Sequence, residues 1–347
     1  RQRQMCIRDR RKTLPDLLLA LDRLDYPPTR LTVVFVDDGS TDGSINLLDP
    51  YVAERDNWHL LSLPINTGKA EALNLALKHF SGGDIIVVYD ADERPEPESL
   101  ARLVQPFVDQ QVGGASGRRA VSNSLASPAA SYTTFEGLVH QCVTMQAKNQ
   151  LALAPALLGA NCAYRRRALA EVGNFKTGAL LEDTDLTVKL TRAGWLLKYV
   201  PEAISYHRVP ETLSGYWRQH TRWSRGFADT ARDQSLATLT APGLPPFVRL
   251  ELLFFSAGYL DRLALLTAGL LLLWRRGVMA VLLGFSLLTP LLQVMVALRI
   301  SGQPGALWRR VVWMPFFFGL DIAMAVASFF DAVRHTEQHW EERDDRQ

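Results

Sequence analysis

An apolar run that ends in closely spaced carboxylates, residues 85–94, constrains the fold of this chain more than any other stretch. It reads Ile-Ile-Val-Val-Tyr-Asp-Ala-Asp-Glu-Arg, which predicts a buried strand followed by an acidic turn. Because residues i and i+2 of an extended chain point the same way, Asp90 and Asp92 can reach one divalent cation. An acidic turn without a ligand would show the same short pattern.

A second apolar run and a polar turn lead to the same edge of the predicted sheet. Residues 31–36 run into Asp37 and Asp38, and open parallel sheets bind ligands outside the carboxyl ends of their strands. Between the two runs, residues 66–70 read Asn-Thr-Gly-Lys-Ala and open a helical pattern. Backbone N–H groups at a helix N-terminus together with Lys69 suit a phosphate, although an ordinary helix start would look the same.

Two further segments carry polar residues at helical positions. Glu182 and Asp183 stand at the start of a predicted helix, where acidic residues are also favoured by the helix dipole alone. Gln219, Arg222 and Trp223 are spaced i, i+3 and i+4 on another predicted helix, so they share one face. An amphipathic helix anchored at a membrane surface by its tryptophan is the alternative for this segment.

The order of the predicted elements indicates an α/β domain over residues 13–245. Up to residue 100, helices alternate with strands at residues 31–36, 58–62 and 84–89, which is the pattern of a parallel sheet. A second half continues with further strands and helices. Residues 1–12 are basic and lack strand or helix periodicity, so we expect a disordered leader there.

The C-terminal part has a different composition. Apolar runs at residues 250–274, 278–298 and 311–330 each have about the 20 residues that a bilayer requires, so residues 246–335 are predicted to be a membrane region with two or three helices. The buried helical core of a soluble protein is the alternative. Asp321 would be costly in lipid and is expected to face protein or a pore. A polar tail follows at residues 336–347.

Charge and cysteine content exclude some classes of function. The formal net charge is only +2, and aromatic and basic residues do not interleave as they do in single-strand binders, so nucleic acid is not an expected partner. The three cysteines are odd in number and widely spaced, which argues against a disulfide framework or a Cys-x-x-Cys metal site. We therefore expect a reducing, cytosolic environment for the main domain.

Five motifs occur in the order seen in family 2 glycosyltransferases: Val-Asp-Asp-Gly-Ser-Thr-Asp-Gly-Ser, Asn-Thr-Gly-Lys-Ala, Tyr-Asp-Ala-Asp, Leu-Glu-Asp-Thr-Asp-Leu and Gln-His-Thr-Arg-Trp. Over residues 13–335 the chain resembles the membrane-embedded processive branch, which includes cellulose, hyaluronan and poly-N-acetylglucosamine synthases. The resemblance implies a GT-A type α/β fold with a mostly parallel sheet, followed by C-terminal transmembrane helices. It also implies a multi-pass protein of the cell (inner) membrane with a cytosolic catalytic domain.

The resemblance implies a metal-dependent hexosyltransferase. Such an enzyme would transfer a sugar, with inversion, from a UDP-sugar to the hydroxyl of a growing glycan. Mg²⁺ or Mn²⁺ is the implied cofactor, bound by Asp92 with Asp90. Glu182 and Asp185 are expected to raise the proton affinity of Asp183. The resemblance assigns the other roles as follows: Asp37, Asp38, Lys69 and Asp90 to the nucleotide sugar, Asp183 to the general base, and Glu182, Gln219, Arg222 and Trp223 to acceptor and diphosphate.

Two alternatives stay open at this point. A non-processive enzyme would transfer one sugar to a lipid, and an inactive, truncated membrane subunit would bind a partner without turnover. The family usually begins its catalytic domain with a hydrophobic strand and a Pro-x-x-Asn-Glu-like turn, which residues 1–12 do not show, so we expect an N-terminal truncation and a missing first strand. The implied partners are a UDP-sugar, a glycan or lipid-linked acceptor, membrane lipids and an accessory membrane subunit.

Overall fold

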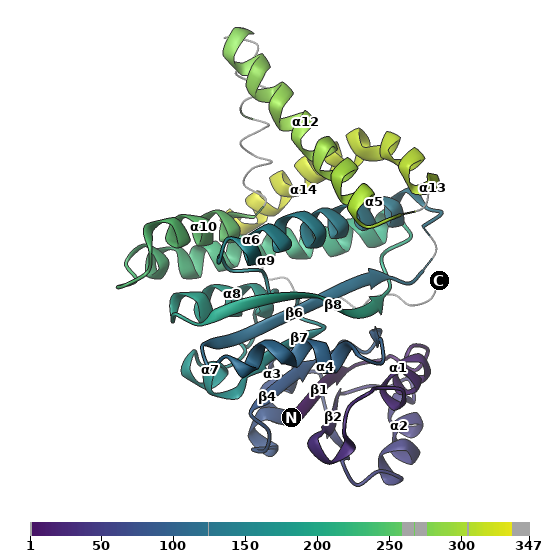
Figure 1. The fold of residues 1–347 in the computed structure, drawn as a ribbon. Coiled ribbons are helices and arrows are strands. Elements are labelled where there is room, and N and C mark those ends of the chain that lie inside the picture. Colours follow the sequence, from purple (N-terminus) through teal and green to yellow (C-terminus); the bar gives the residue numbers. More distant parts are fainter. Residues whose placement is uncertain (1, 124, 259–266, 268–275, 304, 335–347) are drawn as a thin grey trace. The chain divides into compact units, whose positions relative to one another are not determined.

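The structure is a computed structural model that describes residues 2–123, 125–258, 267, 276–303 and 305–334 (Figure 1). The chain forms two compact units. The first consists of Arg1–Ser122, Lys148–Arg208 and Ala241–Leu244, and the second of Asn123–Ala147, Val209–Thr240 and Pro245–Gln347. This division differs from the predicted boundary near residue 245, because two earlier segments group with the C-terminal helices.

An eight-stranded sheet in the order β3-β2-β1-β4-β7-β6-β8-β5 forms the centre of the first unit. The first four strands of this order pair in parallel, as do β6 and β8, whereas β7 is antiparallel to β4 and β6, and β5 is antiparallel to β8. The predicted strands are confirmed, and the complete sheet is mixed. The strands are β1 (Gln2–Ile7), β2 (Thr32–Asp38), β3 (Trp58–Leu63), β4 (Ile85–Val88), β5 (Arg94–Pro95), β6 (Val112–Val121), β7 (Cys162–Arg165) and β8 (Leu196–His207).

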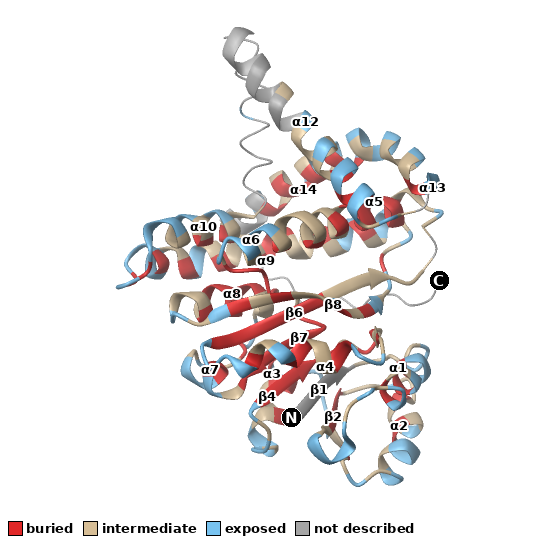
Figure 2. Cartoon of the chain, viewed as in Figure 1, coloured by how far each residue is buried: buried red, intermediate tan, exposed pale blue. Residues whose placement is uncertain are grey.

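β2 is buried along most of its length (Figure 2), and the alternation of its side chains explains the layers of this unit. Val33 and Phe35 belong to a core that includes four leucines of α1, whereas Val34 and Val36 belong to a second core with alanines of α3. Helices thus cover both faces, and β2 is apolar at successive positions, as in other buried parallel strands. The helices of this unit are α1 (Leu14–Asp22), α2 (Ser44–Ala53), α3 (Lys69–His79), α4 (Ser99–Val104), α7 (Arg166–Glu171) and α8 (Glu182–Arg192).

The N-terminal residues differ from the prediction. β1 lies between β2 and β4 and pairs with both, so the expected disordered leader is wrong for residues 2–12, and the place of the strand that was expected to be missing is filled. The backbone supplies the hydrogen bonds of a strand, and the sequence Gln-Arg-Gln-Met-Cys-Ile lacks the apolar run that signals a buried one. Beyond β1, the N–H of Asp9 donates to Ser40 Oγ at 3.0 Å.

The second unit is helical in its described residues. Its core combines Tyr132 and Phe135 of α5 with Tyr216 of α9, Val294 of α12 and Phe317 of α14. The apolar faces of α5 and α9 therefore explain why their segments group with the C-terminal helices. The helices are α5 (Pro128–Leu138), which continues through a π-helical segment (Val139–Met145) into α6 (Gln146–Gln150) at the edge of the unit, α9 (Leu213–Leu239), α10 (Pro246–Ala257), α12 (Arg276–Ile300), α13 (Gly305–Trp308) and α14 (Met314–Arg334).

Within the described residues, one helical stretch, Gly305–Ser328, is long and apolar enough to cross a membrane by length and composition, and Leu288–Ile300 is a shorter apolar helix. The first of these overlaps the predicted span at residues 311–330. The predicted span at residues 278–298 falls within α12, and most of the span at residues 250–274 lies outside the described residues, as does the polar tail. The presence of two or three membrane helices stays a prediction.

Asp321, in the apolar helix α14, is fully buried within the second unit. The hydroxyl of Tyr132 donates to its Oδ2 at 3.0 Å, and the hydroxyl of Tyr216 donates to its Oδ1. These donors replace the water that a buried carboxylate loses. The expectation that Asp321 faces protein is therefore confirmed.

Candidate functional site

Asp38 ties the carboxyl end of β2 to the turn before α3. Its carboxylate, which is 2% exposed, accepts hydrogen bonds from the N–H groups of Thr67 and Gly68 at 2.6 and 2.9 Å. Gly68 has a φ of +90°, which favours glycine, and it leads directly into the first turn of α3. Asp38 therefore holds the turn that presents Lys69.

Asp37 is also fully buried. Its Oδ2 accepts a hydrogen bond from the N–H of Ser40 at 3.1 Å, while its Oδ1 has no hydrogen-bond partner among the described residues. A buried carboxylate oxygen of this kind retains the capacity to accept a hydrogen bond from a ligand.

Lys69 is the point at which three of the predicted motifs meet, its own turn, the Asp-x-Asp turn and the acidic start of α8. Its Nζ lies 2.8 Å from Asp90 Oδ1, 2.9 Å from the carbonyl oxygen of Gly159 and 3.1 Å from Glu182 Oε1. Burial alone would lower the pKa of Lys69, but the carboxylates of Asp90 and Glu182 outweigh it and raise the pKa above its ordinary value. The ammonium group is therefore a fixed positive charge beside the Asp-x-Asp turn.

Asp183 lies against the backbone of Gly159. A Cβ added to Gly159 would be 2.8 Å from Asp183 Oδ2, so only glycine leaves room for the carboxylate in this position. The other oxygen, Oδ1, accepts a hydrogen bond from the N–H of Thr184 at 2.7 Å. Its acidic neighbours are paired with cations, Glu182 with Lys69 and Asp185 with Lys189 at 2.7 Å, which offsets the repulsion on Asp183 that we expected from them.

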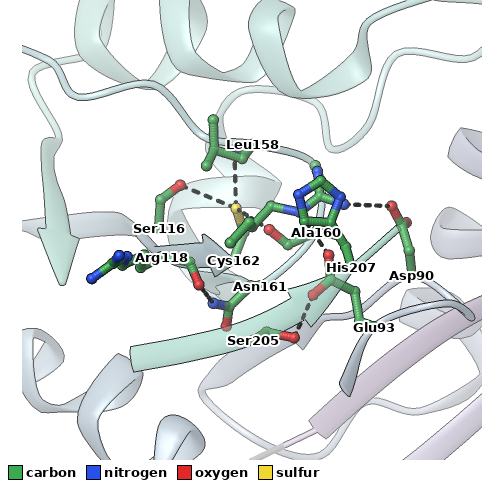
Figure 3. A network of polar contacts seen from close by, with 12 residues as sticks. Asp90, Glu93, Ser116, Arg118, Leu158, Ala160, Asn161, Cys162, Ser205 and His207 are labelled. Atoms are coloured by element: carbon green, nitrogen blue, oxygen red, sulfur yellow. Dashed lines mark hydrogen bonds and ion pairs between the residues drawn. The ribbon is translucent and has the colours of Figure 1, made fainter. Parts of the chain in front are cut away.

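The segment before β7 is locked into this arrangement by hydrogen bonds within the sheet (Figure 3). The side-chain amide of Asn161 donates to the carbonyl oxygens of Arg118 and Ala203 at 3.0 and 2.8 Å. Cys162 Sγ accepts a hydrogen bond from the N–H of Leu158 at 3.1 Å, and burial raises the pKa of this thiol to about 11. Cys162 is thus a neutral, structural group that helps to hold the loop with Gly159.

Two charged residues at the site were not predicted from the sequence. Glu93 is fully buried, and its carboxylate accepts hydrogen bonds from Arg119 Nε at 2.6 Å and from the hydroxyl of Ser205. Arg119 Nη2 lies 3.7 Å from Asp90 Oδ2. Burial raises the pKa of Glu93 to about 7, although Arg119 acts in the opposite direction. The signal in the sequence was an acidic residue directly after Asp-x-Asp, but nothing local pointed to its partner on β6.

The carboxylates of Asp90 and Asp92 fit a hard divalent cation, because such ions take oxygen ligands and complete their shell with phosphates and water. Both side chains are partly exposed just beyond β4. In the described part of the chain, no group of three or more His, Cys, Asp or Glu side chains could hold a metal without a substrate. Two carboxylates leave coordination positions open on such a cation, and the oxygens of a diphosphate can fill them.

Gln219, Arg222 and Trp223 lie on α9, which belongs to the second unit, whereas Lys69, Asp90 and Asp183 belong to the first. His220 lies between two aromatic rings of this helix, with its ring 3.8 Å from that of Tyr216 and 4.8 Å from that of Trp223 between centroids. Its Nε2 is 2.9 Å from Glu136 Oε2. Gln219 Oε1 is buried and has no hydrogen-bond partner among the described residues.

Solved structures with a similar fold include a mannosyltransferase and TarS. A mannosyltransferase from Pyrobaculum calidifontis, in complex with GDP-Man and Mn²⁺, has a TM-score of 0.66 at 20% identity, with 97% of this chain and 87% of that chain covered. TarS from Staphylococcus aureus in complex with UDP-GlcNAc has a TM-score of 0.53 at 18% identity, with 99% of this chain and 94% of that chain covered. At these identities the likeness shows a GT-A-like glycosyltransferase fold.

The sequence matches the family described as "Glycosyltransferase like family 2" over residues 6–226. An N-acetylglucosaminyltransferase of Mesorhizobium japonicum is 32% identical over 282 residues, which are 76% of this chain and 63% of that protein. The aligned part of the chain spans only 50 to 63% of the length of three curated relatives, including this one. The family match includes β2, β4, the turn with Lys69 and the acidic start of α8, and this chain belongs to glycosyltransferase-like family 2.

Proposed function

We propose that the protein transfers a sugar, with inversion, from a UDP-sugar to a hydroxyl group of a glycan. The observation that carries this proposal is the convergence on Lys69 of the Asp-x-Asp turn, the Gly159 loop and the acidic start of α8. A cation between carboxylates at the ends of the strands is an arrangement that binds a metal–diphosphate and deprotonates a nearby hydroxyl.

In this proposal the donor nucleotide lies at the end of β2. The Oδ1 atom of Asp37, which has no hydrogen-bond partner among the described residues, accepts a hydrogen bond from the nucleotide. Asp38 keeps the turn before α3 in place through Thr67 and Gly68. Lys69 then faces the diphosphate and neutralises part of the charge that develops on it when the sugar departs.

Asp92, assisted by Asp90, would hold Mg²⁺ or Mn²⁺ together with the diphosphate. A divalent ion in this place supplies further positive charge to the leaving UDP. Asp90 also forms ion pairs, because Lys69 lies beside its Oδ1 and Arg119 beside its Oδ2. Asp90 therefore also fixes the two cations that border the diphosphate position.

Asp183 takes the proton from the attacking hydroxyl in this proposal. The missing side chain of Gly159 leaves space for its carboxylate, and Thr184 orients one of its oxygens. Glu182 is held by Lys69 at 3.1 Å, so its carboxylate stays beside Asp183 and does not take its place. Proton removal by a positioned carboxylate typically contributes about a hundredfold or more to the rate.

We further propose that synthesis is processive and occurs at a membrane, with Gln219, Arg222 and Trp223 as the residues for acceptor and diphosphate. The support is the resemblance in that motif and the apolar stretch Gly305–Ser328. A relative named poly-beta-1,6-N-acetyl-D-glucosamine synthase, 26% identical over 241 residues, favours N-acetylglucosamine as the sugar. Product length on a gel tests this part, because single additions to a lipid acceptor would contradict processivity.

The central test is calorimetric titration of UDP, with GDP for comparison, in the presence of Mn²⁺ and again with a chelator. We expect metal-dependent binding of UDP and a strong loss of it in Asp92→Asn, because an amide is a poorer ligand than a carboxylate for a hard cation. Asp22→Asn, at an exposed carboxylate paired with Arg55, is the matched control. Absence of metal-dependent UDP binding in the wild type would overturn the proposal in favour of an inactive subunit, and tighter binding of GDP would overturn the choice of UDP.

A further inference from the structure

Glu93 links the Asp-x-Asp turn to β6 and β8, two strands that β7 separates from β4 in the sheet. Its side chain is fully buried. One carboxylate oxygen accepts a hydrogen bond from Arg119 Nε at 2.6 Å, and the other accepts one from the hydroxyl of Ser205. Figure 3 shows Glu93 beside Ser205, with Asp90 close by. The turn itself is closed by the N–H of Glu93, which donates to the carbonyl oxygen of Asp90 at 3.0 Å.

The sheet places these partners next to one another. Arg119 of β6 and Ser205 of β8 are paired residues in the register of the two parallel strands. Directly after Glu93, β5 pairs with β8 through Arg94 and Pro95. The position of the turn therefore depends on contacts with both strands rather than on its own sequence.

Arg119 also connects this anchor to the candidate metal ligands. Its Nη2 lies 3.7 Å from Asp90 Oδ2, while Lys69 contacts the other oxygen of the same carboxylate at 2.8 Å. Asp90 is thus held from both sides by cations. The Arg119 side chain is 20% exposed, and Glu93 is not exposed at all, so this pair is shielded from solvent far more than a surface ion pair.

We propose that Glu93 and Arg119 are positioning residues that hold the turn with Asp90 and Asp92 in the conformation that binds the metal–diphosphate of the donor. This inference rests on the proposed function and deepens it, because the sequence motifs assigned neither residue a role at the site. Neither residue touches the reacting atoms. Their effect passes through the orientation of the two aspartates.

The direction in which Mn²⁺ affinity changes in Arg119→Met distinguishes a positioning role of Arg119 from simple charge repulsion. Arg119→Met removes a positive charge near a cation site, so Coulomb repulsion alone predicts tighter binding of Mn²⁺. Positioning predicts weaker binding, because Glu93 loses its cation in a buried place and the turn moves. Ser205→Ala changes no charge and removes only the second contact of Glu93, so it tests the same idea without any electrostatic contribution.

The experiment measures Mn²⁺ binding by electron paramagnetic resonance of the full chain at saturating UDP, together with UDP affinity in a chelator. We expect Mn²⁺ binding to be about tenfold weaker in Arg119→Met and measurably weaker in Ser205→Ala, which is the usual scale for residues that support metal ligands. UDP affinity without metal should stay the same in Ser205→Ala, because this variant keeps both cations that border the diphosphate position. Arg102→Met, which removes the α4 arginine of an exposed pair with Glu98, is the matched control and should bind as the wild type does.

Equal or tighter Mn²⁺ binding in Arg119→Met would overturn the inference. If this variant does not fold, Ser205→Ala carries the decision, and unchanged Mn²⁺ binding in it overturns the inference too. Failure of the proposed function gives a different result, because the wild type itself would then show no UDP-dependent Mn²⁺ binding.

Discussion

Replacement of Gly159 by alanine tests the placement of the proposed base more directly than a change of the base itself. A Cβ at this position would lie 2.8 Å from Asp183 Oδ2 and 3.3 Å from its Cγ, closer than ordinary contacts. The carboxylate must therefore retreat by about 0.6 Å to reach a normal van der Waals distance. The carbonyl oxygen of Gly159 also accepts the hydrogen bond from Lys69, so the same change disturbs the cation beside Asp90.

The expected magnitude has two parts. Gly159 has a φ of +72°, and an alanine in this region costs about 1 kcal/mol, which lowers the unfolding midpoint by roughly 2–4 °C for a domain of this size. Displacement of a reacting group by a large fraction of an ångström lowers the rate by roughly tenfold to a hundredfold. We expect this loss in the rate of sugar transfer, with the affinity for UDP changed by less than about threefold.

Gly173→Ala is the matched control. Gly173 has a φ of +85°, so alanine is strained there too, but no atom lies within 4 Å of an added Cβ. The assay is single-turnover sugar transfer with saturating donor, alongside thermal unfolding of both variants. Both should lose similar stability, and only Gly159→Ala should lose rate. A full transfer rate in Gly159→Ala, or equal losses in the two variants, would refute the placement of Asp183 against Gly159.

Three other predictions follow from the described contacts. Asp183→Asn should bind UDP-sugar almost normally and lose at least about a hundredfold in transfer rate, and a collapse of binding would move Asp183 to the nucleotide or metal site. Burial would lower the pKa of His220, but the carboxylate of Glu136 outweighs burial and raises this pKa above 6.5. The contribution of the His220–Glu136 pair to the free energy of unfolding is therefore fully present below pH 6.5, and it is lost as the pH rises through the raised pKa of His220. Glu136→Gln should flatten this fall in the unfolding midpoint, and an unchanged profile would contradict the pairing. The full chain should stay with membranes after carbonate washing, because Gly305–Ser328 is long enough to span a bilayer, and its release would contradict a membrane span.

Much of the fold around the site follows from local sequence. The strands β2 and β4 were predictable because each is a short apolar run that ends in carboxylates, and the helix α3 was predictable from its glycine turn and spacing. Asp90, Lys69 and Glu182 were each recognisable as polar residues at the ends of such elements. The meeting of Asp90 and Lys69 follows from the rule that parallel strands bring their carboxyl ends to one edge, whereas Glu182 reaches them through the packing of α8.

The errors of the prediction concern residues whose place depends on distant partners. β1 has no apolar run, and only its position between β2 and β4 makes it a strand. The grouping of α5 and α9 with the C-terminal helices depends on which apolar faces meet, and helical spacing does not say which partner a face will choose.

The sequence by itself determined the chemistry of the site, because the residue types and their spacing within each turn are local properties. Tertiary structure alone decided how those groups are held. The pairing of Glu93 with Arg119 joins residues 26 positions apart, and the contact of Asp183 with Gly159 joins two separate loops. Such contacts depend on the register of the strands and on the packing of whole elements, which no short window of sequence encodes.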